Sequence, residues 1–300
     1  MADHFPPTLD PHAALRWQGM SLPESPWLHE EVAQRMQERL DLIKQQPDSW
    51  LHWAPLKGGI QAHGLLRQRY PQAACTVLET SQRVSDVQQV LRVPWWTPQR
   101  WLQPQTLVVS KVVQPVQMLW ANMHLHMVAD PQALMAHWHS ALQVNGFLMF
   151  SCLGPDSLKE LHRLYQMLGW PAPSHEFTDM HDWGDQLVAA GFAEPVMDME
   201  RITLTFETPQ RLLQELRGLG RNLNVARFPA LRGRHWHAQL LSALSKMPLQ
   251  LTFEVLYGHA FKPASRLTVR AQSEISLQDM RAALQRGKTT GGHGAQKEQT

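Results

Sequence analysis

The chain has 300 residues, of which 43% are hydrophobic and 18% charged, so it can build the core of a large domain. Its apolar runs all fall short of the roughly 18 to 20 residues that span a bilayer. The first residues, MADHFPPTLDPHAALRW, contain acids and prolines but no apolar segment of the kind that forms a secretory signal. We therefore expect a cytoplasmic protein that does not associate with membranes.

The cysteines indicate the compartment of the protein, and the charge distribution indicates its partner. Cys75 and Cys152 are the two cysteines, and both lie in apolar runs, where buried thiols of a reducing compartment are expected. Residues 201–300 carry 15 Lys and Arg against 6 Asp and Glu, an excess that predicts an acidic partner. These basic residues are spaced along predicted helices, so a small acidic protein or a solvated helix face suits them at least as well as nucleic acid. No nucleic-acid partner is expected.

The two ends of the chain differ from its middle. Residues 1–26 contain five prolines and no apolar periodicity, which predicts a flexible N-terminal arm. Residues 27–43 place an apolar residue at every third or fourth position, the pattern of an amphipathic helix. Residues 264–300 form a C-terminal extension, whose last segment, GKTTGGHGAQKEQT, is typical of disorder.

Between these ends, strand-like and helix-like segments alternate. Strands are predicted at 50–54, 73–80, 106–110, 116–122, 147–153, 195–206 and 251–261. Helices are predicted at 60–69, 130–142, 157–168, 179–190, 208–219 and 234–246. This alternation predicts an α/β fold with a doubly wound, mostly parallel, seven-stranded sheet. Residues 208–247 form a helical insertion before the last strand, within a domain that covers 27–263.

Two features at strand ends suggest a ligand site. Gly58 and Gly59 follow the first predicted strand, where glycines let the backbone approach a ligand closely. Glu79 ends the second strand, at the position from which an acid can bind ribose hydroxyls. An ordinary turn and a solvated glutamate are the alternative. The 16 histidines include no pair at i and i+4 backed by an acid, so no metal site is expected.

Longer motifs carry a resemblance to a known family. The segment 120–161 contains WANMHLHMVADP, with Ala121-Asn122 and Asp130, and ends in GPDSLKEL. It resembles the fourth-to-fifth-strand region of the biotin-pathway malonyl-acyl-carrier-protein O-methyltransferases. The similarity continues through 177–206, 215–224 and 251–263. The resemblance implies the Rossmann-like fold of class I methyltransferases and S-adenosylmethionine as cofactor.

The implied reaction methylates the free carboxylate of a malonyl group held by an acyl carrier protein, which would be the acidic partner. Five residues are implied for the cofactor: His52, Gly58, Gly59, Glu79 and Asn122. Four are implied for the substrate and its carrier: Trp17, Arg217, Arg221 and Asn222. Because a carboxylate is already ionised at neutral pH, no catalytic base is implied, and the protein contributes alignment and exclusion of water.

The chain departs from the family pattern after its first strand. The family has an acid followed by Gly-x-Gly-x-Gly, whereas this chain reads HWAPLKGG at 52–59, with His52 in place of the acid. Trp17 is the aromatic residue nearest to the tyrosine of the family's N-terminal arm. Two alternatives therefore stay open: a non-catalytic binding protein with the same fold, or a methyltransferase for another small acid or a quinone-like substrate. The chain is expected to act as a monomer.

Overall fold

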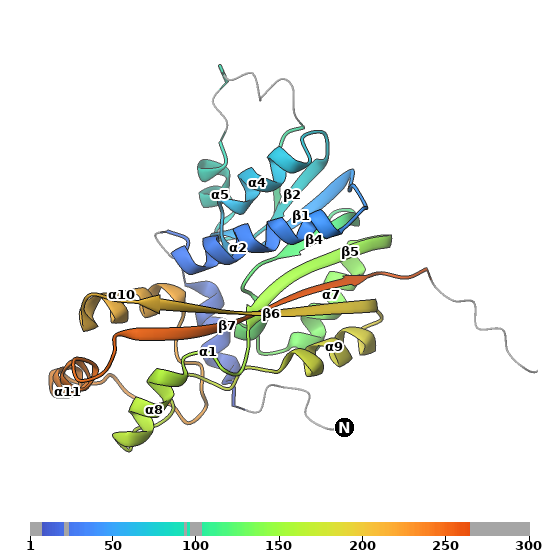
Figure 1. The fold of residues 1–300 in the computed structure, drawn as a ribbon. Coiled ribbons are helices and arrows are strands. Elements are labelled where there is room, and N and C mark those ends of the chain that lie inside the picture. Colours follow the sequence, from blue (N-terminus) through green and yellow to red (C-terminus); the bar gives the residue numbers. More distant parts are fainter. Residues whose placement is uncertain (1–7, 21–23, 93–94, 97–103, 265–300) are drawn as a thin grey trace, which may run out of the picture. The chain divides into compact units, whose positions relative to one another are not determined.

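A computed structural model describes residues 8–20, 24–92, 95–96 and 104–264 (Figure 1). The predicted C-terminal extension lies outside the described residues, apart from its first position. The strands are β1 (Ser49–Trp53), β2 (Ala74–Leu78), β3 (Leu107–Val109), β4 (Val116–Ala121), β5 (Leu142–Leu153), β6 (Ala193–Thr205) and β7 (Gln250–Phe261). The helices are α1 (Pro11–Gly19), α2 (Trp27–Arg39), α3 (Pro55–Gly58), α4 (Ala62–Arg69), α5 (Val84–Val90), α7 (Pro131–Ala141), α8 (Lys159–Met167), α9 (Met180–Ala189), α10 (Pro209–Leu219) and α11 (Arg234–Leu244). Two 3-10 turns, η1 (Leu40–Leu42) and η2 (Leu125–Met127), complete the set.

The strands form a single seven-stranded sheet with the order β3-β2-β1-β4-β5-β7-β6. The first five strands of this order pair in parallel, and β7 runs antiparallel to both β5 and β6. The prediction of a mostly parallel, doubly wound sheet is confirmed. The chain order of the strands reverses between β1 and β4, and ligands of such sheets bind beyond the carboxyl ends of the strands at this point.

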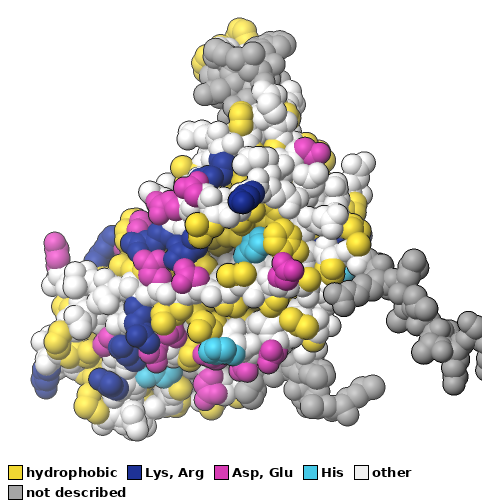
Figure 2. Space-filling model, turned by 45° about the vertical axis from the view of Figure 1, so that its right-hand side comes forward, with side chains coloured by type: hydrophobic (Ala, Val, Ile, Leu, Met, Phe, Trp, Pro, Cys, Tyr) yellow, Lys and Arg dark blue, Asp and Glu magenta, His cyan; other side chains and the backbone are white. Residues whose placement is uncertain are grey.

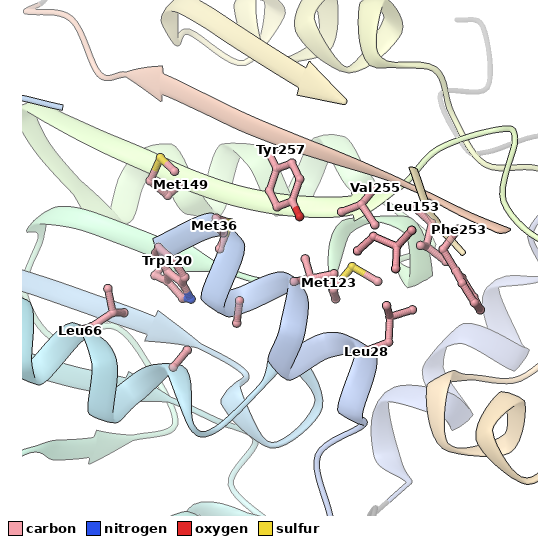
Figure 3. Close-up of a cluster of buried hydrophobic side chains, with 14 of the residues drawn as sticks. Leu28, Met36, Leu66, Trp120, Met123, Met149, Leu153, Phe253, Val255 and Tyr257 are labelled. Atoms are coloured by element: carbon pink, nitrogen blue, oxygen red, sulfur yellow. The ribbon is translucent and has the colours of Figure 1, made fainter. Parts of the chain in front are cut away.

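Helices cover both faces of the sheet. Along β5, Phe147 and Met149 belong to one buried apolar cluster, while Leu148 and Phe150 belong to another. Successive residues of a strand point to opposite faces, so the two clusters are the two cores of the domain. The first lies under α2 and α4, where Figure 3 shows side chains of α2 packed toward β4, β5 and β7. The second lies under α7 and α9.

Two helices begin with the same capping signature, an aspartate followed by a proline. One of them, α1, was not predicted from the sequence. Asp130 caps α7 by accepting a hydrogen bond from the Ala133 amide at 2.8 Å, with proline at the first helical position. Asp10 does the same for α1, because its carboxylate accepts from the amides of His12 and Ala13. The expectation of a flexible arm over residues 1–26 is therefore wrong for 11–19, which form a capped helix with Trp17 buried.

A second correction concerns the strand predicted at 147–153, which begins five residues earlier and includes Asn145-Gly146. α7 already ends at Ala141, and β5 begins at Leu142, so the pair lies inside the strand. Asn145 has a left-handed backbone (φ 63°), next to an irregularity in the β4–β5 register. The pair therefore forms a bulge. In the described part of the chain, no helix is both long enough and apolar enough to cross a membrane.

Candidate active site

A cavity of about 400 Å³ lies at the carboxyl ends of β1, β2 and β4, which is the position expected for a ligand of this sheet. We call it the strand-end cavity. Its wall is built from the end of α1, the start of α2, the residues after β1 and β2, and the connection from β4 to α7. Charged and titratable side chains contribute much of it: His29, Lys57, Glu79, Arg83, His124, Asp130 and His137.

Glu79 lines this cavity, and one of its carboxylate oxygens has no hydrogen-bond partner among the described residues. The residue is 4% exposed, and its Oε1 accepts a hydrogen bond from the Thr80 amide at 3.0 Å. Arg83 Nη1 lies 3.7 Å from the same oxygen. Oε2 is buried and has no hydrogen-bond partner among the described residues. Buried polar atoms are normally satisfied, so this oxygen marks a place for a donor such as a ribose hydroxyl.

The connection after β1 is a turn of helix rather than a glycine-rich loop. Ala54 adopts a left-handed backbone (φ 47°), and Pro55 then begins the short helix α3. This turn carries Lys57 into the cavity wall, where its Nζ donates to the Trp17 carbonyl and lies 4.2 Å from the centre of the Trp17 ring. Burial, with a smaller contribution from Arg83, lowers the pKa of Lys57 to about 7.

Of the residues implied for the cofactor, Glu79 lines the strand-end cavity, and His52 is placed elsewhere. The His52 ring is fully buried and stacks on His63 of α4 at 5.8 Å. Trp53, the next residue, points to the other face, meets His137 of α7 at 4.9 Å, and lines the cavity. Alternation along the strand explains why one position separates the two outcomes.

Gly58 and Asn122 support the cavity from behind rather than forming its surface. Asn122 is fully buried, and its Nδ2 donates to the carbonyls of Gly58 and of His29, the latter at 2.7 Å. Its Oδ1 accepts from the Ser151 hydroxyl at 2.6 Å. A Cβ atom on Gly58 would lie 2.6 Å from the Asn122 carbonyl oxygen, so only glycine fits this approach. Gly59 has a positive φ of 105° and packs near α2.

A second cavity of about 260 Å³ adjoins the first and is mainly apolar. We call it the apolar cavity. Leucines of α10 and α11, with Trp236 and Phe253, form much of its wall. His29, Met123, Met127 and Leu219 line both cavities, so the two share a wall. The two cavities are therefore immediate neighbours.

The residues implied for the substrate gather at the apolar cavity and its junction with the first. Arg217, Arg221 and Asn222 all line the apolar cavity. The Arg221 guanidinium also lies 5.6 Å from the centre of the Trp17 ring, which the Lys57 ammonium contacts as well. Burial, followed by repulsion from Arg217, lowers the pKa of Arg221 below its usual value. Asn222 is held in place because its Nδ2 donates to the Ala172 carbonyl at 2.7 Å.

Three site residues escaped the sequence analysis: Lys57, Arg83 and His29. Arg83 donates to the Gln18 carbonyl, so two cations bind the last carbonyls of α1. His29 donates from Nδ1 to the Lys57 carbonyl at 2.5 Å, and burial lowers its pKa to about 4. Asp10-Pro11 is the sequence signal that could have placed α1 over these residues.

Among the described residues, no three His, Cys, Asp or Glu side chains cluster as a metal ion would require.

Sequence comparisons find relatives over most of the chain, although no protein-family model matches it. A malonyl-[acyl-carrier protein] O-methyltransferase of Laribacter hongkongensis is 36% identical over 251 residues, covering 80% of this chain and 84% of the relative. One of Gallionella capsiferriformans is 37% identical over 257 residues, with 80% and 86% covered.

Among solved structures, the YcgJ protein of Bacillus subtilis aligns with a TM-score of 0.51 and 9% identity, covering 78% of this chain and 99% of that one. A Bacillus halodurans protein described as a candidate methyltransferase gives the same TM-score with 11% identity, covering 78% and 100%. At these identities the likeness concerns the fold alone, which is the Rossmann-like fold of class I methyltransferases.

Proposed function

We propose that this chain, which belongs to the malonyl-[acyl-carrier protein] O-methyltransferase family, transfers a methyl group from S-adenosylmethionine to the free carboxylate of a carrier-bound malonyl group. The observation that carries the proposal is the pair of adjoining cavities. One offers an unpaired carboxylate oxygen of Glu79, and the other is apolar with Arg217 and Arg221 in its wall. This pairing suits a nucleoside cofactor beside a short acyl chain that ends in an anion.

The strand-end cavity fits the cofactor through Glu79. In the proposal, Glu79 Oε2 accepts a hydrogen bond from a ribose hydroxyl, and Oε1 stays fixed by Thr80 and Arg83. Bound S-adenosylmethionine supplies an electrophilic methyl group on a sulfonium. Trp17 and Gln18 of α1 line the cavity as well, so the helix shields the reacting atoms from water.

The arginines position the malonyl carboxylate that accepts the methyl group. A malonyl carboxylate is ionised at neutral pH because ordinary carboxyl groups have pKa values of about 4. It therefore needs orientation rather than a base. Arg221 lies beside Trp17 at the junction of the two cavities, which is where a carboxylate must sit to meet the methyl group. The leucines of α10 and α11 then cover the methylene and thioester end of the acyl group.

The reaction would serve biotin synthesis in the cytoplasm. The carrier would be an acidic protein that approaches the exposed arginines of the insertion. Arg217 and Arg234 are exposed on α10 and α11. Elsewhere basic and acidic groups pair, as Arg35 does with Glu31 at 2.7 Å, and Figure 2 shows Lys and Arg side chains beside Asp and Glu on one face. Unpaired basic groups near the apolar cavity are therefore the better carrier contact.

Mass spectrometry of the carrier tests this function. Malonyl carrier protein incubated with the enzyme and S-adenosylmethionine should gain the mass of one methyl group. Acetyl carrier protein is the matched control, because it has the same thioester but no free carboxylate, and it should stay unchanged. Unmodified malonyl carrier under conditions in which a relative methylates it would contradict the proposal.

A further inference from the structure

Lys57 places a cation inside the strand-end cavity, where a cationic cofactor would have to bind. Its side chain is 8% exposed, and the ammonium is held by the Trp17 carbonyl and the face of the Trp17 ring. A carbonyl oxygen and an aromatic face together form a recognised type of cation site. The Lys57 ammonium therefore fills a cation-binding position in the wall of the cofactor cavity.

We propose that Lys57 sets the charge preference of this cavity, so that the site favours the neutral thioether S-adenosylhomocysteine over the cationic sulfonium S-adenosylmethionine. This inference rests on the proposed function, because it assumes that the cavity takes an S-adenosyl ligand. It adds that one residue of this chain makes the product bind more tightly than the cofactor whenever Lys57 is charged.

Among the described residues, no ion pair joins Lys57 to an acidic group of the cavity wall. The titratable groups around it are Glu79 and Arg83 after β2, His29 of α2, His124 after β4 and Arg221 after α10. The Glu79 carboxylate already lies next to Arg83. Burial lowers the pKa values of His29 and His124 to about 4, so both are neutral near pH 7. Asp130 and His137 line the cavity from the α7 side.

The size of the cavity makes the repulsion effective. In a space of about 400 Å³, a ligand that fills the cavity cannot hold its sulfonium far from the Lys57 ammonium. Because Lys57 is buried, its ammonium repels a second cation beside it appreciably, whereas it does not repel a thioether in the same place. The cofactor and its product differ at this atom by a methyl group and one positive charge, so the ratio of their affinities reports on the charge near the sulfur.

The pH dependence has a defined sign. Because the pKa of Lys57 is lowered to about 7, its ammonium is largely charged at about pH 6 and largely neutral at about pH 8.5. Affinity for S-adenosylmethionine should therefore rise with pH relative to that for S-adenosylhomocysteine. Titration of the ligands' own amino groups also contributes to the ratio, because the sulfonium lowers the pKa of the nearby amino group, so the wild-type ratio is compared at each pH with that of Lys57→Met.

Calorimetric titration of the full chain with both ligands tests the inference. For the wild type, we expect Kd of S-adenosylmethionine divided by Kd of S-adenosylhomocysteine to fall about tenfold between about pH 6 and about pH 8.5. Lys57→Met should give a low ratio at every pH, and Lys57→Arg a high one. Lys44→Met, at an exposed lysine after α2, is the control and should follow the wild type.

The outcomes separate the two proposals. A wild-type ratio that does not change with pH, or that equals the ratio in Lys57→Met, overturns the role of Lys57 and leaves the proposed function intact. Failure of both ligands to bind the wild type overturns the proposed function, and this inference with it. Lys57→Arg, which keeps its charge at every pH, takes the place of Lys57→Met as the reference if that variant does not fold.

Discussion

The two cavities differ in how their walls are built, although they share His29 and Met123. The strand-end cavity depends on charged groups and on a backbone turn that departs from the family pattern, with Lys57 in its wall. The apolar cavity is formed by side chains of the insertion helices, including the Arg217 and Arg221 that the resemblance implied. Under the proposed function, the turn after β1 differs from the family pattern while Glu79 and the arginines of the neighbouring cavity stand where the resemblance implies them.

Loss of the Arg221 guanidinium should have the largest effect, and it should fall on the acceptor side. Hydrogen bonds to charged groups contribute up to about 3 kcal/mol, so Arg221→Ala should lower kcat/KM for malonyl carrier by about 100-fold. Steady-state kinetics with varied carrier measures this. Arg92→Ala, at an exposed arginine after α5 and outside the insertion, is the matched control and should have little effect. Equal losses in the two variants would contradict a specific role for Arg221.

Filling the apolar cavity should separate the two sites. Leu216 of α10 lines the apolar cavity and not the strand-end cavity. A tryptophan here would fill space that the acyl group needs, so Leu216→Trp should reduce methyl transfer by about 30-fold, which corresponds to about 2 kcal/mol. Affinity for S-adenosylhomocysteine, measured by calorimetry, should stay within about twofold of wild type. Loss of that affinity in a folded variant would show that the cavities are not independent.

Glu79→Gln is the converse test on the cofactor side. The amide keeps the size of the side chain but removes the charge that strengthens a hydrogen bond to ribose, so Kd for S-adenosylhomocysteine should rise about tenfold. The carrier should still bind, which fluorescence anisotropy of a labelled carrier can measure. An unchanged Kd for the nucleoside would refute the ribose assignment.

Gly58 tests the support behind the cavity, with the smallest effect. A Cβ at this position would meet the Asn122 carbonyl oxygen at 2.6 Å, so Gly58→Ala should lower the free energy of unfolding by about 1 kcal/mol. Gly64→Ala is the control, because nothing lies within 4 Å of its Cβ position in α4. That change should stabilise the chain by about 0.5 to 1 kcal/mol. Denaturant unfolding compares them, and equal destabilisation would contradict the packing argument.

Local patterns predicted most of the fold but less of the site. The alternation of apolar segments placed the strands to within a few residues, apart from the early start of β5, because burial dictates those residues directly. α1 was missed because its apolar residues are few, although Asp10-Pro11 carries the same capping signature as Asp130-Pro131. Its position over the cavity depends on contacts with Lys57 and Arg83, which are distant in sequence.

The position of a residue in the sequence predicted only some of the site residues. His52 was placed at the cofactor because it stands where the family has an acid, yet Trp53 is the residue that faces the cavity. A shift of one residue along a strand exchanges its two faces, and sequence alone does not fix which face each residue takes. Glu79 was predicted from its position at the end of a strand, and Arg217 and Arg221 from the resemblance, and each lines a cavity.

The most direct test of whether the altered turn still leaves a cofactor site is the thermal stability of the wild-type chain with S-adenosylhomocysteine. A ligand present at about 100 times its Kd stabilises a fold by about 2.7 kcal/mol. We predict a rise in Tm that grows with the logarithm of ligand concentration and shrinks in Glu79→Gln. A Tm that stays the same up to millimolar ligand, in a chain that unfolds cooperatively, would contradict the account.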